Sequence, residues 1–119
     1  MSEEVVLVTG GTGLYGSAIR HVVEETGVEI SKWFFASSKD ADLRDAQQTA
    51  ALFDRVKPTH VIHLAAMVGG LFKNMKYKVE FYRENMLIND NVMECCRKHK
   101  VEKLVKRIFH THVIVTVFK

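Results

Sequence analysis

The chain has 119 residues, 47% hydrophobic and 26% charged, which is typical of one small globular domain. The net charge of +3 is too small to indicate a nucleic-acid partner, and no apolar run is long enough to cross a membrane. The two cysteines, Cys95 and Cys96, are adjacent, which gives neither a disulfide framework nor the spacing of metal ligands. We therefore expect a protein of the reducing cytoplasm without metal, nucleic acid or membrane partners.

The first elements of the chain are a strand and a helix. Residues 5–9 form a continuous apolar run, which predicts a buried strand of a parallel sheet. A segment with apolar residues at helical spacing follows, and Gly27 stands where the helix C-cap is expected. The predicted inner stripe of this helix consists of Tyr15, Ala18, Ile19, Val22 and Val23.

Strand-like and helix-like segments alternate along the rest of the chain. Asp45, with Gln48 three residues later, resembles a capping box at the start of a second helix. This alternation predicts an α/β fold, in which a parallel sheet with right-handed crossovers is flanked by helices. We expect its strands, numbered along the chain, in the order 3-2-1-4. The remaining predicted elements are a strand at residues 32–36, a helix with inner residues Ala46, Ala50, Phe53 and Val56, a strand at residues 60–64, a long helix at residues 81–99 and a strand from residue 103.

A glycine-rich turn joins the first strand to the first helix. One glycine permits such a turn, another lets the backbone approach a dinucleotide diphosphate, and a third lets the helix pack on the strand. The helix N-terminus adds free N–H groups and a partial positive charge. We therefore expect a partial Rossmann fold, with a purely structural turn as the alternative. The candidate cofactor residues here are Gly10, Gly11, Thr12, Gly13, Leu14, Tyr15 and Gly16, of which Tyr15 is alternatively a core residue.

The residues after the second strand bear on the choice of cofactor. An acidic residue there would bind the ribose 2′-hydroxyl of NAD, whereas hydroxyl and basic groups suit the 2′-phosphate of NADP. Ser37, Ser38 and Lys39 stand at this position, and no acid occurs before Asp40. The pattern favours NADP, and the alternative is an ordinary polar turn.

Three segments resemble signature motifs of the extended short-chain dehydrogenase/reductase family. Residues 9–16, Thr-Gly-Gly-Thr-Gly-Leu-Tyr-Gly, resemble its TGGxGxxG signature. Asp42 and Leu43 resemble its acidic-aliphatic pair, and residues 61–66 resemble its VIHLAA strand motif. Together the three segments indicate a member of this family.

Further segments are similar to the GDP-L-fucose synthase family, namely residues 37–43, 58–60 and 67–70, within a resemblance that covers residues 5–105. That family consists of NADPH-dependent epimerase-reductases that convert GDP-4-keto-6-deoxymannose to GDP-fucose. The resemblance implies an oxidoreductase and isomerase of nucleotide-sugar biosynthesis that uses NADP(H) and a GDP-sugar. For an intact member of the family, the resemblance is compatible with a homodimer.

The resemblance also implies roles for single residues. It places Asp42 and Leu43 beside the adenine, although Asp42 alternatively caps the following turn. It places Ala65 and Ala66 beside the cofactor, where small side chains let a ribose or nicotinamide pass. His63 lies inside an apolar strand, so we expect a hydrogen-bonded core histidine rather than a catalytic one.

The resemblance ends at Val105. The family continues to a catalytic serine and a Tyr-x-x-x-Lys pair, whereas no tyrosine of this chain has a lysine four positions later. We expect residues 1–105 to form an incomplete NAD(P)-binding Rossmann domain and residues 106–119 to be a divergent tail, frame-shifted or alternatively spliced. Residues 113–118 suit an extra strand. A non-catalytic NADP-binding module and an unstable truncated fragment are the alternatives to an active enzyme.

Overall fold

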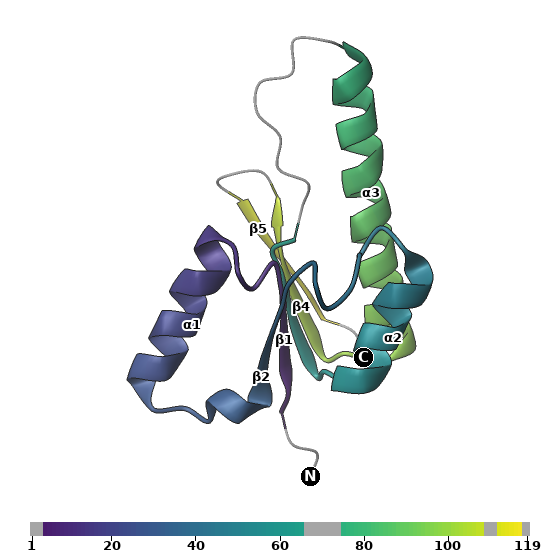
Figure 1. Ribbon diagram of the computed structural model, residues 1–119. Coiled ribbons are helices and arrows are strands. Elements are labelled where there is room, and N and C mark those ends of the chain that lie inside the picture. The colour runs from purple at the N-terminus through teal and green to yellow at the C-terminus, as the bar shows by residue number, and fades with distance from the viewer. Residues whose placement is uncertain (1–3, 66–74, 109–111, 118–119) are drawn as a thin grey trace.

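The described part of the chain, residues 4–65, 75–108 and 112–117 of a computed structural model, forms a five-stranded sheet with helices on both faces. Helix α1 lies against one face, and α2 and α3 lie against the other (Figure 1). The predicted α/β fold is confirmed. The elements are β1 (Val6–Thr9), α1 (Leu14–Thr26), a short 3₁₀ helix (Ile30–Lys32), β2 (Trp33–Ala36), α2 (Ala46–Val56), β3 (His60–His63), α3 (Met75–Lys98), β4 (Lys103–Ile108) and β5 (His112–Val117).

The strands lie in the order β2-β1-β3-β4-β5, so the predicted order 3-2-1-4 is wrong. Strand β1 lies between β2 and β3, and Leu7 pairs with Phe34 on one side and Val61 on the other. Burial explains this arrangement. Leu7 is fully buried, whereas three of the four residues of β2 are only half buried, as expected for an edge strand. The chain therefore crosses from one side of β1 to the other between β2 and β3.

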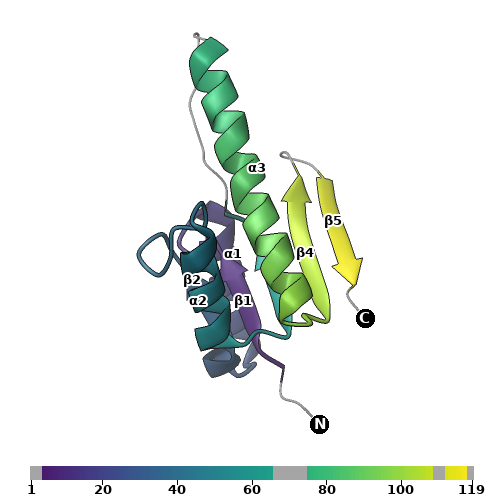
Figure 2. The same cartoon turned by 90° about the vertical axis from the view of Figure 1, so that its right-hand side faces the viewer.

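The last strand makes the sheet mixed. Strands β1 to β4 are parallel, and β5 pairs antiparallel with β4, with Val105 opposite Val115. The extra strand that the sequence predicts at residues 113–118 is thus confirmed, and it lies at the edge of the sheet beside β4 (Figure 2). The sequence analysis did not predict the antiparallel direction. This direction follows from the short connection between the two strands, which permits only a hairpin.

Helix α3 is longer than the sequence predicts. It begins at Met75 rather than at residue 81, and its N-terminal half projects beyond the sheet (Figure 2). Val79, Tyr82 and Met86 on that half are 43%, 65% and 51% exposed. The predicted start was late because Val79 and Tyr82 do not belong to a buried apolar stripe, which is the signal on which the prediction rests.

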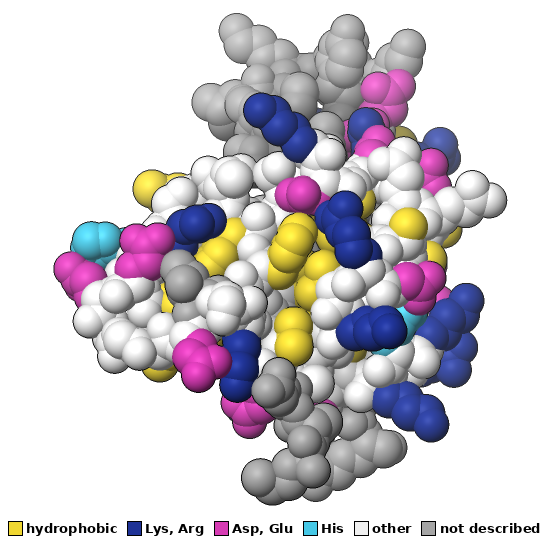
Figure 3. Space-filling view, turned by 60° about the horizontal axis from the view of Figure 1, so that its bottom comes forward, with side chains coloured by type: hydrophobic (Ala, Val, Ile, Leu, Met, Phe, Trp, Pro, Cys, Tyr) yellow, Lys and Arg dark blue, Asp and Glu magenta, His cyan; other side chains and the backbone are white. Residues whose placement is uncertain are grey.

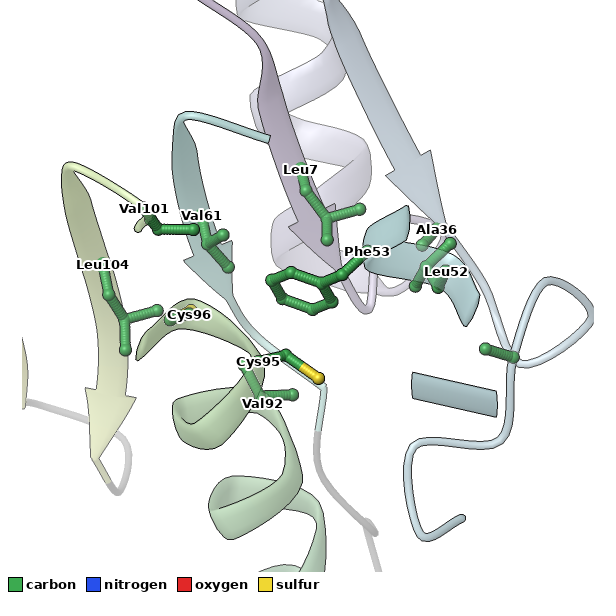
Figure 4. Packing of buried hydrophobic residues seen from close by; sticks show 11 residues of the cluster. Leu7, Ala36, Leu52, Phe53, Val61, Val92, Cys95, Cys96, Val101 and Leu104 are labelled. Carbon is green, nitrogen blue, oxygen red and sulfur yellow. The ribbon is translucent and has the colours of Figure 1, made fainter. Parts of the chain in front are cut away.

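The main core lies between the sheet and helices α2 and α3. Leu7, Val61 and Leu104 point from the strands toward Phe53 of α2 and Val92 of α3, and all five are buried (Figure 4). Phe53 is the largest fully buried side chain of this group. These contacts join the first and last parallel strands to one hydrophobic layer, which fixes the position of the loops at the strand ends.

Both cysteines belong to this core. Cys95 and Cys96 are free thiols, 6% and 0% exposed. Burial raises the pKa of both thiols, that of Cys96 to about 12. Because the thiolate is the reactive form, neither side chain is suited to act as a nucleophile.

The apolar stripe predicted for α1 is only partly buried. Val23 is 5% exposed, whereas Tyr15 and Val22 are 48% and 55% exposed. In the described part of the chain, α1 is the one helix on its face of the sheet, so only a narrow strip of it meets the strands (Figure 1). The interpretation of Tyr15 as a core residue is therefore wrong.

Two local signals for helix ends are confirmed. Gly27 follows α1 in the left-handed conformation, with φ 76°. The Asp45 carboxylate accepts hydrogen bonds from the backbone N–H groups of Gln47 and Gln48, at 2.8 and 3.2 Å, and so caps α2. The Gln48 side chain, however, accepts from the N–H of Asp42 at 2.9 Å, which ties the preceding loop to α2.

Helix α3 ends in a Schellman motif in which a lysine occupies the usual glycine position. Lys100 has φ 54°, and the N–H of Val101 donates to the carbonyl of Cys96 at 3.0 Å. Lys100→Gly should therefore raise the free energy of unfolding by about 0.5–1 kcal/mol, because glycine adopts this conformation without steric cost. Urea unfolding measures the change. Lys98→Gly, in the last turn of the same helix, should instead destabilise by about 1 kcal/mol, and equal effects of both variants would contradict the prediction.

Candidate cofactor site

A cavity of about 390 Å³ lies at the carboxyl ends of β1, β2 and β3. The connection after β1 leads to β2 on one side of β1, and the connection after β2 crosses to β3 on the other side. Ligands of open α/β sheets bind at such a switch point. The described residues that line the cavity are Thr9, Gly10, Ala36, Ser37, Ser38, Ala41, Asp42, Leu43, Arg44, Leu52, Ala65 and Ile88.

Close backbone packing explains the glycines of the turn. Gly10 has φ 68°, and a Cβ atom there would lie 2.9 Å from the backbone nitrogen of Ala65. A Cβ on Gly11 would lie 2.7 Å from the Cα of Phe35, and one on Gly16 would overlap the carbonyl of Gly10. The turn is thus a tightly packed joint between β1, its two neighbouring strands and α1.

The N-terminus of α1 is open to an anion. Gly13 is the N-cap residue and provides no side chain to accept the first N–H groups, and the first turn contains no acidic residue. Thr12, Gly13, Leu14 and Tyr15 are exposed, Leu14 to 82%. The absence of a capping side chain and the positive end of the helix dipole together favour a phosphate at this position. Of the predicted turn residues, Gly10 lines the cavity itself, and the others lie beside it.

The loop after β2 contributes hydroxyl groups to the cavity wall. Ser37 and Ser38 line the cavity, whereas Lys39 is exposed and is not among the described lining residues. The N–H of Ser37 donates to the Asp40 carboxylate at 2.8 Å, and the hydroxyl of Ser37 lies 3.3 Å from the same oxygen. The first acid after β2 is therefore held by the backbone N–H of Ser37, within the same turn.

Asp42 lines the cavity and also caps a turn. Its carboxylate accepts hydrogen bonds from the backbone N–H, Nε and Nη2 of Arg44, each at 3.0 Å. These bonds hold the pKa of Asp42 below its usual value. The two roles considered for Asp42 are therefore compatible, because the side chain that closes the turn also lies on the cavity wall.

Buried polar groups hold the same loop in place. The carbonyl of Leu43 accepts a hydrogen bond from the side-chain amide of Asn91 at 2.9 Å. The hydroxyl of Thr49 donates to the carbonyl of Asp45 at 2.8 Å and lies 3.3 Å from the carbonyl of Leu43. Thr49 and Asn91 are 0% and 8% exposed. Because Thr49 belongs to α2 and Asn91 to α3, both helices contact the wall formed by Leu43, and Asn91 holds it by a hydrogen bond.

A second buried network holds the opposite wall. The hydroxyl oxygen of Thr9 accepts from the N–H groups of Leu64 at 3.1 Å and Ala65 at 3.2 Å, so its own proton faces His63 Nδ1, 2.6 Å away. His63 Nε2 then carries the proton and donates to the side-chain oxygen of Asn89 at 3.0 Å. Burial lowers the pKa of His63 to about 4, which keeps the ring neutral. The expectation of a hydrogen-bonded core histidine is confirmed.

The end of β3 is described only in part. Ala65 lines the cavity and is half buried. Ala66 and the loop at residues 67–70, which the sequence places beside the cofactor and the substrate, lie outside the described residues. Ala65 thus provides the small side chain expected where the third parallel strand meets the cavity.

The sequence did not predict Arg44, in the loop before α2, or the residues that α2 and α3 add to the site. Leu52 and Ile88 come from the two helices, and Arg44 comes from the loop. The Arg44 guanidinium also bonds Glu84 of α3 at 3.4 Å. One signal for Arg44 was available in the sequence. It stands two residues after Asp42, a spacing that allows its backbone N–H and its guanidinium to bond the Asp42 carboxylate.

The opposite end of the sheet bears the basic helix ends. Figure 3 shows this end, where Lys and Arg side chains gather over the side of α2 and α3. Arg97, Lys98 and Lys100 are exposed there, and Arg97 pairs with Glu94. His99 donates to the carbonyl of Cys95 at 3.0 Å and faces Asp54 at 2.7 Å. The basic run is thus a solvated helix end with locally paired charges.

In residues 4–65, 75–108 and 112–117, no three His, Cys, Asp or Glu side chains come together as metal ligands. No helix within these ranges has the length and apolar character needed to cross a membrane.

A model of the NAD dependent epimerase/dehydratase family matches residues 6–107. The chain belongs to this family. The site of this epimerase/dehydratase-family chain, at the carboxyl ends of its parallel strands, therefore lies in a fold known for binding dinucleotides.

Relatives narrow the similarity. This chain is 56% identical over 104 residues to GDP-L-fucose synthase of Dictyostelium discoideum. It is 58% identical over 100 residues to a probable GDP-L-fucose synthase of Drosophila melanogaster. These matches cover 87% and 84% of this chain but 32% and 31% of the relatives. The chain thus spans about a third of the length of these curated relatives. The resemblance to GDP-L-fucose synthases that the motifs predict is confirmed.

A solved structure agrees with this similarity. The crystal structure of a GDP-L-fucose synthetase from Naegleria fowleri bound to NADP superposes with a TM-score of 0.80 at 48% sequence identity. The superposition covers 89% of this epimerase/dehydratase-family chain and 34% of that chain. The predicted Rossmann-like fold is confirmed.

Proposed function

We propose that the chain is the cofactor-binding part of an NADPH-dependent epimerase-reductase that makes GDP-L-fucose from GDP-4-keto-6-deoxy-D-mannose. The observation that carries this proposal is the cavity at the switch point, beside the uncapped N-terminus of α1. The relatives named GDP-L-fucose synthase support the substrate, and the NADP-bound structure from Naegleria fowleri supports the cofactor.

In this proposal the residues of the chain bind and orient NADP(H). The glycine turn, residues 10–16, and the α1 N-terminus take the diphosphate. Ser37 and Ser38 lie toward the 2′-phosphate, and Asp42 and Leu43 lie toward the adenine. The pair Ala65 and Ala66 leaves room for a ribose or the nicotinamide. The cofactor supplies the hydride, while the preformed hydrogen bonds of the two walls reduce the ordering that binding requires.

The proposal assigns no catalytic residue to this chain. The reaction needs a tyrosine acid/base beside a lysine and a serine that polarises the carbonyl, and no Tyr-x-x-x-Lys pair is among the 119 residues. His63, the buried histidine nearest the cavity, is neutral and bonded on both nitrogens. We further propose that residues 1–105 are the NAD(P)-binding domain and that the location is cytoplasmic, which the two free, buried cysteines support.

Titration of the purified chain with NADPH tests the proposal. We expect saturable binding of one NADPH per chain, and a single unfolding transition that rises with NADPH concentration. At a concentration one hundred times the Kd, stabilisation should be about 2.7 kcal/mol. Calorimetry and thermal unfolding measure the two effects, with ATP as a control that lacks the nicotinamide half. An unfolding temperature that does not change with NADPH would contradict the proposal.

A further inference from the structure

Among the described residues that line the cavity, Arg44 is the one with a cationic side chain. The sequence assigned the role of binding a 2′-phosphate to Lys39, together with Ser37 and Ser38. Lys39 is exposed and does not belong to the described lining, whereas Ser38 and Arg44 both line the cavity. The positive charge nearest the cavity thus comes from the loop before α2 and not from the turn after β2.

The contacts of Arg44 hold its guanidinium in a fixed orientation. Its Nε and Nη2 atoms donate to the Asp42 carboxylate, each at 3.0 Å. Asp42 is itself fixed, because its N–H donates to the Gln48 side chain at 2.9 Å. A guanidinium held by a bidentate pair loses less conformational freedom when it binds a further anion.

Arg44 also keeps the donor capacity that a phosphate needs. A guanidinium has five N–H groups. In the described part of the chain two of them donate to Asp42, and a third reaches Glu84 at a longer 3.4 Å. Two donors therefore remain, and the contact with Glu84 is exposed and weak enough to exchange.

The neighbouring acids do not oppose an anion here. Arg44 neutralises Asp42, and Asp40 is directed at the backbone of Ser37 and at Arg55. A 2′-phosphate on this wall would therefore meet a cation and the hydroxyl of Ser38 rather than a free carboxylate. A 2′-hydroxyl would gain less from the same guanidinium, because the hydroxyl carries no charge.

We infer that Arg44, rather than Lys39, is the residue that selects a 2′-phosphorylated dinucleotide over one with a free 2′-hydroxyl. The inference rests on the proposed function, since it assumes that a dinucleotide occupies this cavity. In this inference Glu84 competes with the phosphate, because it accepts a hydrogen bond from one N–H group of Arg44 until the phosphate binds.

Calorimetric titration of the full chain with NADP⁺ and NAD⁺ separates the two nucleotides. Arg44→Gln should weaken NADP⁺ binding about tenfold or more and change NAD⁺ binding less than about threefold. Lys39→Gln should change both less than about threefold. Arg97→Gln is the matched control, because it removes an arginine that is also paired with a carboxylate but is far from the cavity. Glu84→Gln should strengthen NADP⁺ binding about twofold.

Several results would overturn the inference while the proposed function stands. These are an equal loss of both nucleotides in Arg44→Gln, no loss of either, or a selective loss of NADP⁺ in Lys39→Gln. Thermal unfolding of each variant confirms that it is folded, and Arg44→Lys, which keeps the charge but not the bidentate geometry, should recover part of the NADP⁺ affinity. If the unmodified chain binds neither nucleotide, the proposed function fails, and the inference fails with it.

Discussion

Gly13→Asp is expected to weaken NADPH binding by about 100-fold while the chain stays folded. Gly13 has φ −76° and ψ −176°, which any residue adopts, and a Cβ atom would meet only the carbonyl of Gly10, at 3.3 Å. Aspartate is a preferred N-cap residue, so its carboxylate would accept N–H groups of the first turn. It would thereby occupy the proposed diphosphate position and repel the phosphates, at a cost of about 2–3 kcal/mol.

Binding and stability should therefore change in opposite directions in this variant. Urea unfolding of Gly13→Asp should show stability unchanged or raised by about 0.5 kcal/mol. Gly13→Asn is the matched control, because asparagine caps equally well without the charge and should cost binding only about tenfold. If the aspartate variant binds NADPH as tightly as the unmodified chain, the diphosphate does not lie at the N-terminus of α1.

The features that could be predicted from the sequence depend on short stretches of chain. Gly27 ends α1 in a left-handed conformation, and Asp45 caps α2, because each acts within four residues along the chain. The position of Gly10 follows in the same way from the sharp turn between a buried strand and a helix. Such signals place the glycine turn at the end of β1 without any knowledge of strand pairing.

The strand order could not be predicted in this way. The alternation of elements indicates a parallel sheet, but it does not say on which side of β1 the third strand lies. That choice depends on contacts between distant residues, such as the bond between Thr9 and His63, which are 54 positions apart. The hydroxyl of Thr9 also binds the N–H groups after β3, so a single polar side chain attaches β3 to β1.

The residues of the candidate site also fall into those that the sequence predicts and those that it does not. Sequence motifs indicated the wall residues in loops, such as Ser38, Leu43 and Ala65, because their chemistry is evident from type and position. Leu52 and Ile88 were missed as site residues. Helical periodicity shows that such residues face inward, but not whether they meet the core or a cavity. Arg44 was missed because a single arginine in a loop carries no pattern that distinguishes a solvated side chain from one that its pairing with Asp42 holds beside a cavity.

Acid is expected to destabilise the fold through His63. The ring is buried and neutral, and its pKa is lowered from 6.5 to about 4, first by burial. In the unfolded chain the same group titrates near 6.5, so between these values the unfolded state binds the proton and the folded state does not. The free energy of unfolding should therefore fall as the pH drops from about 6.5 to about 4 and level off below. The total contribution of this residue is about 3 kcal/mol.

Urea unfolding at several pH values between 7 and 4 measures this slope. His63→Gln should be less stable at pH 7, because it disturbs the bonds to Thr9 and Asn89, yet its stability should depend less on pH than that of the unmodified chain. His21→Gln, a change at a side chain that is 70% exposed, should leave the slope as it is. Equal slopes in all three proteins would show that folding does not shift the pKa of His63. Thr9 bonds both His63 and the N–H of Ala65, and Ala65 lies against Gly10. Protonation of His63 in the same pH range should therefore also loosen the hydrogen bonds that hold this wall of the cavity.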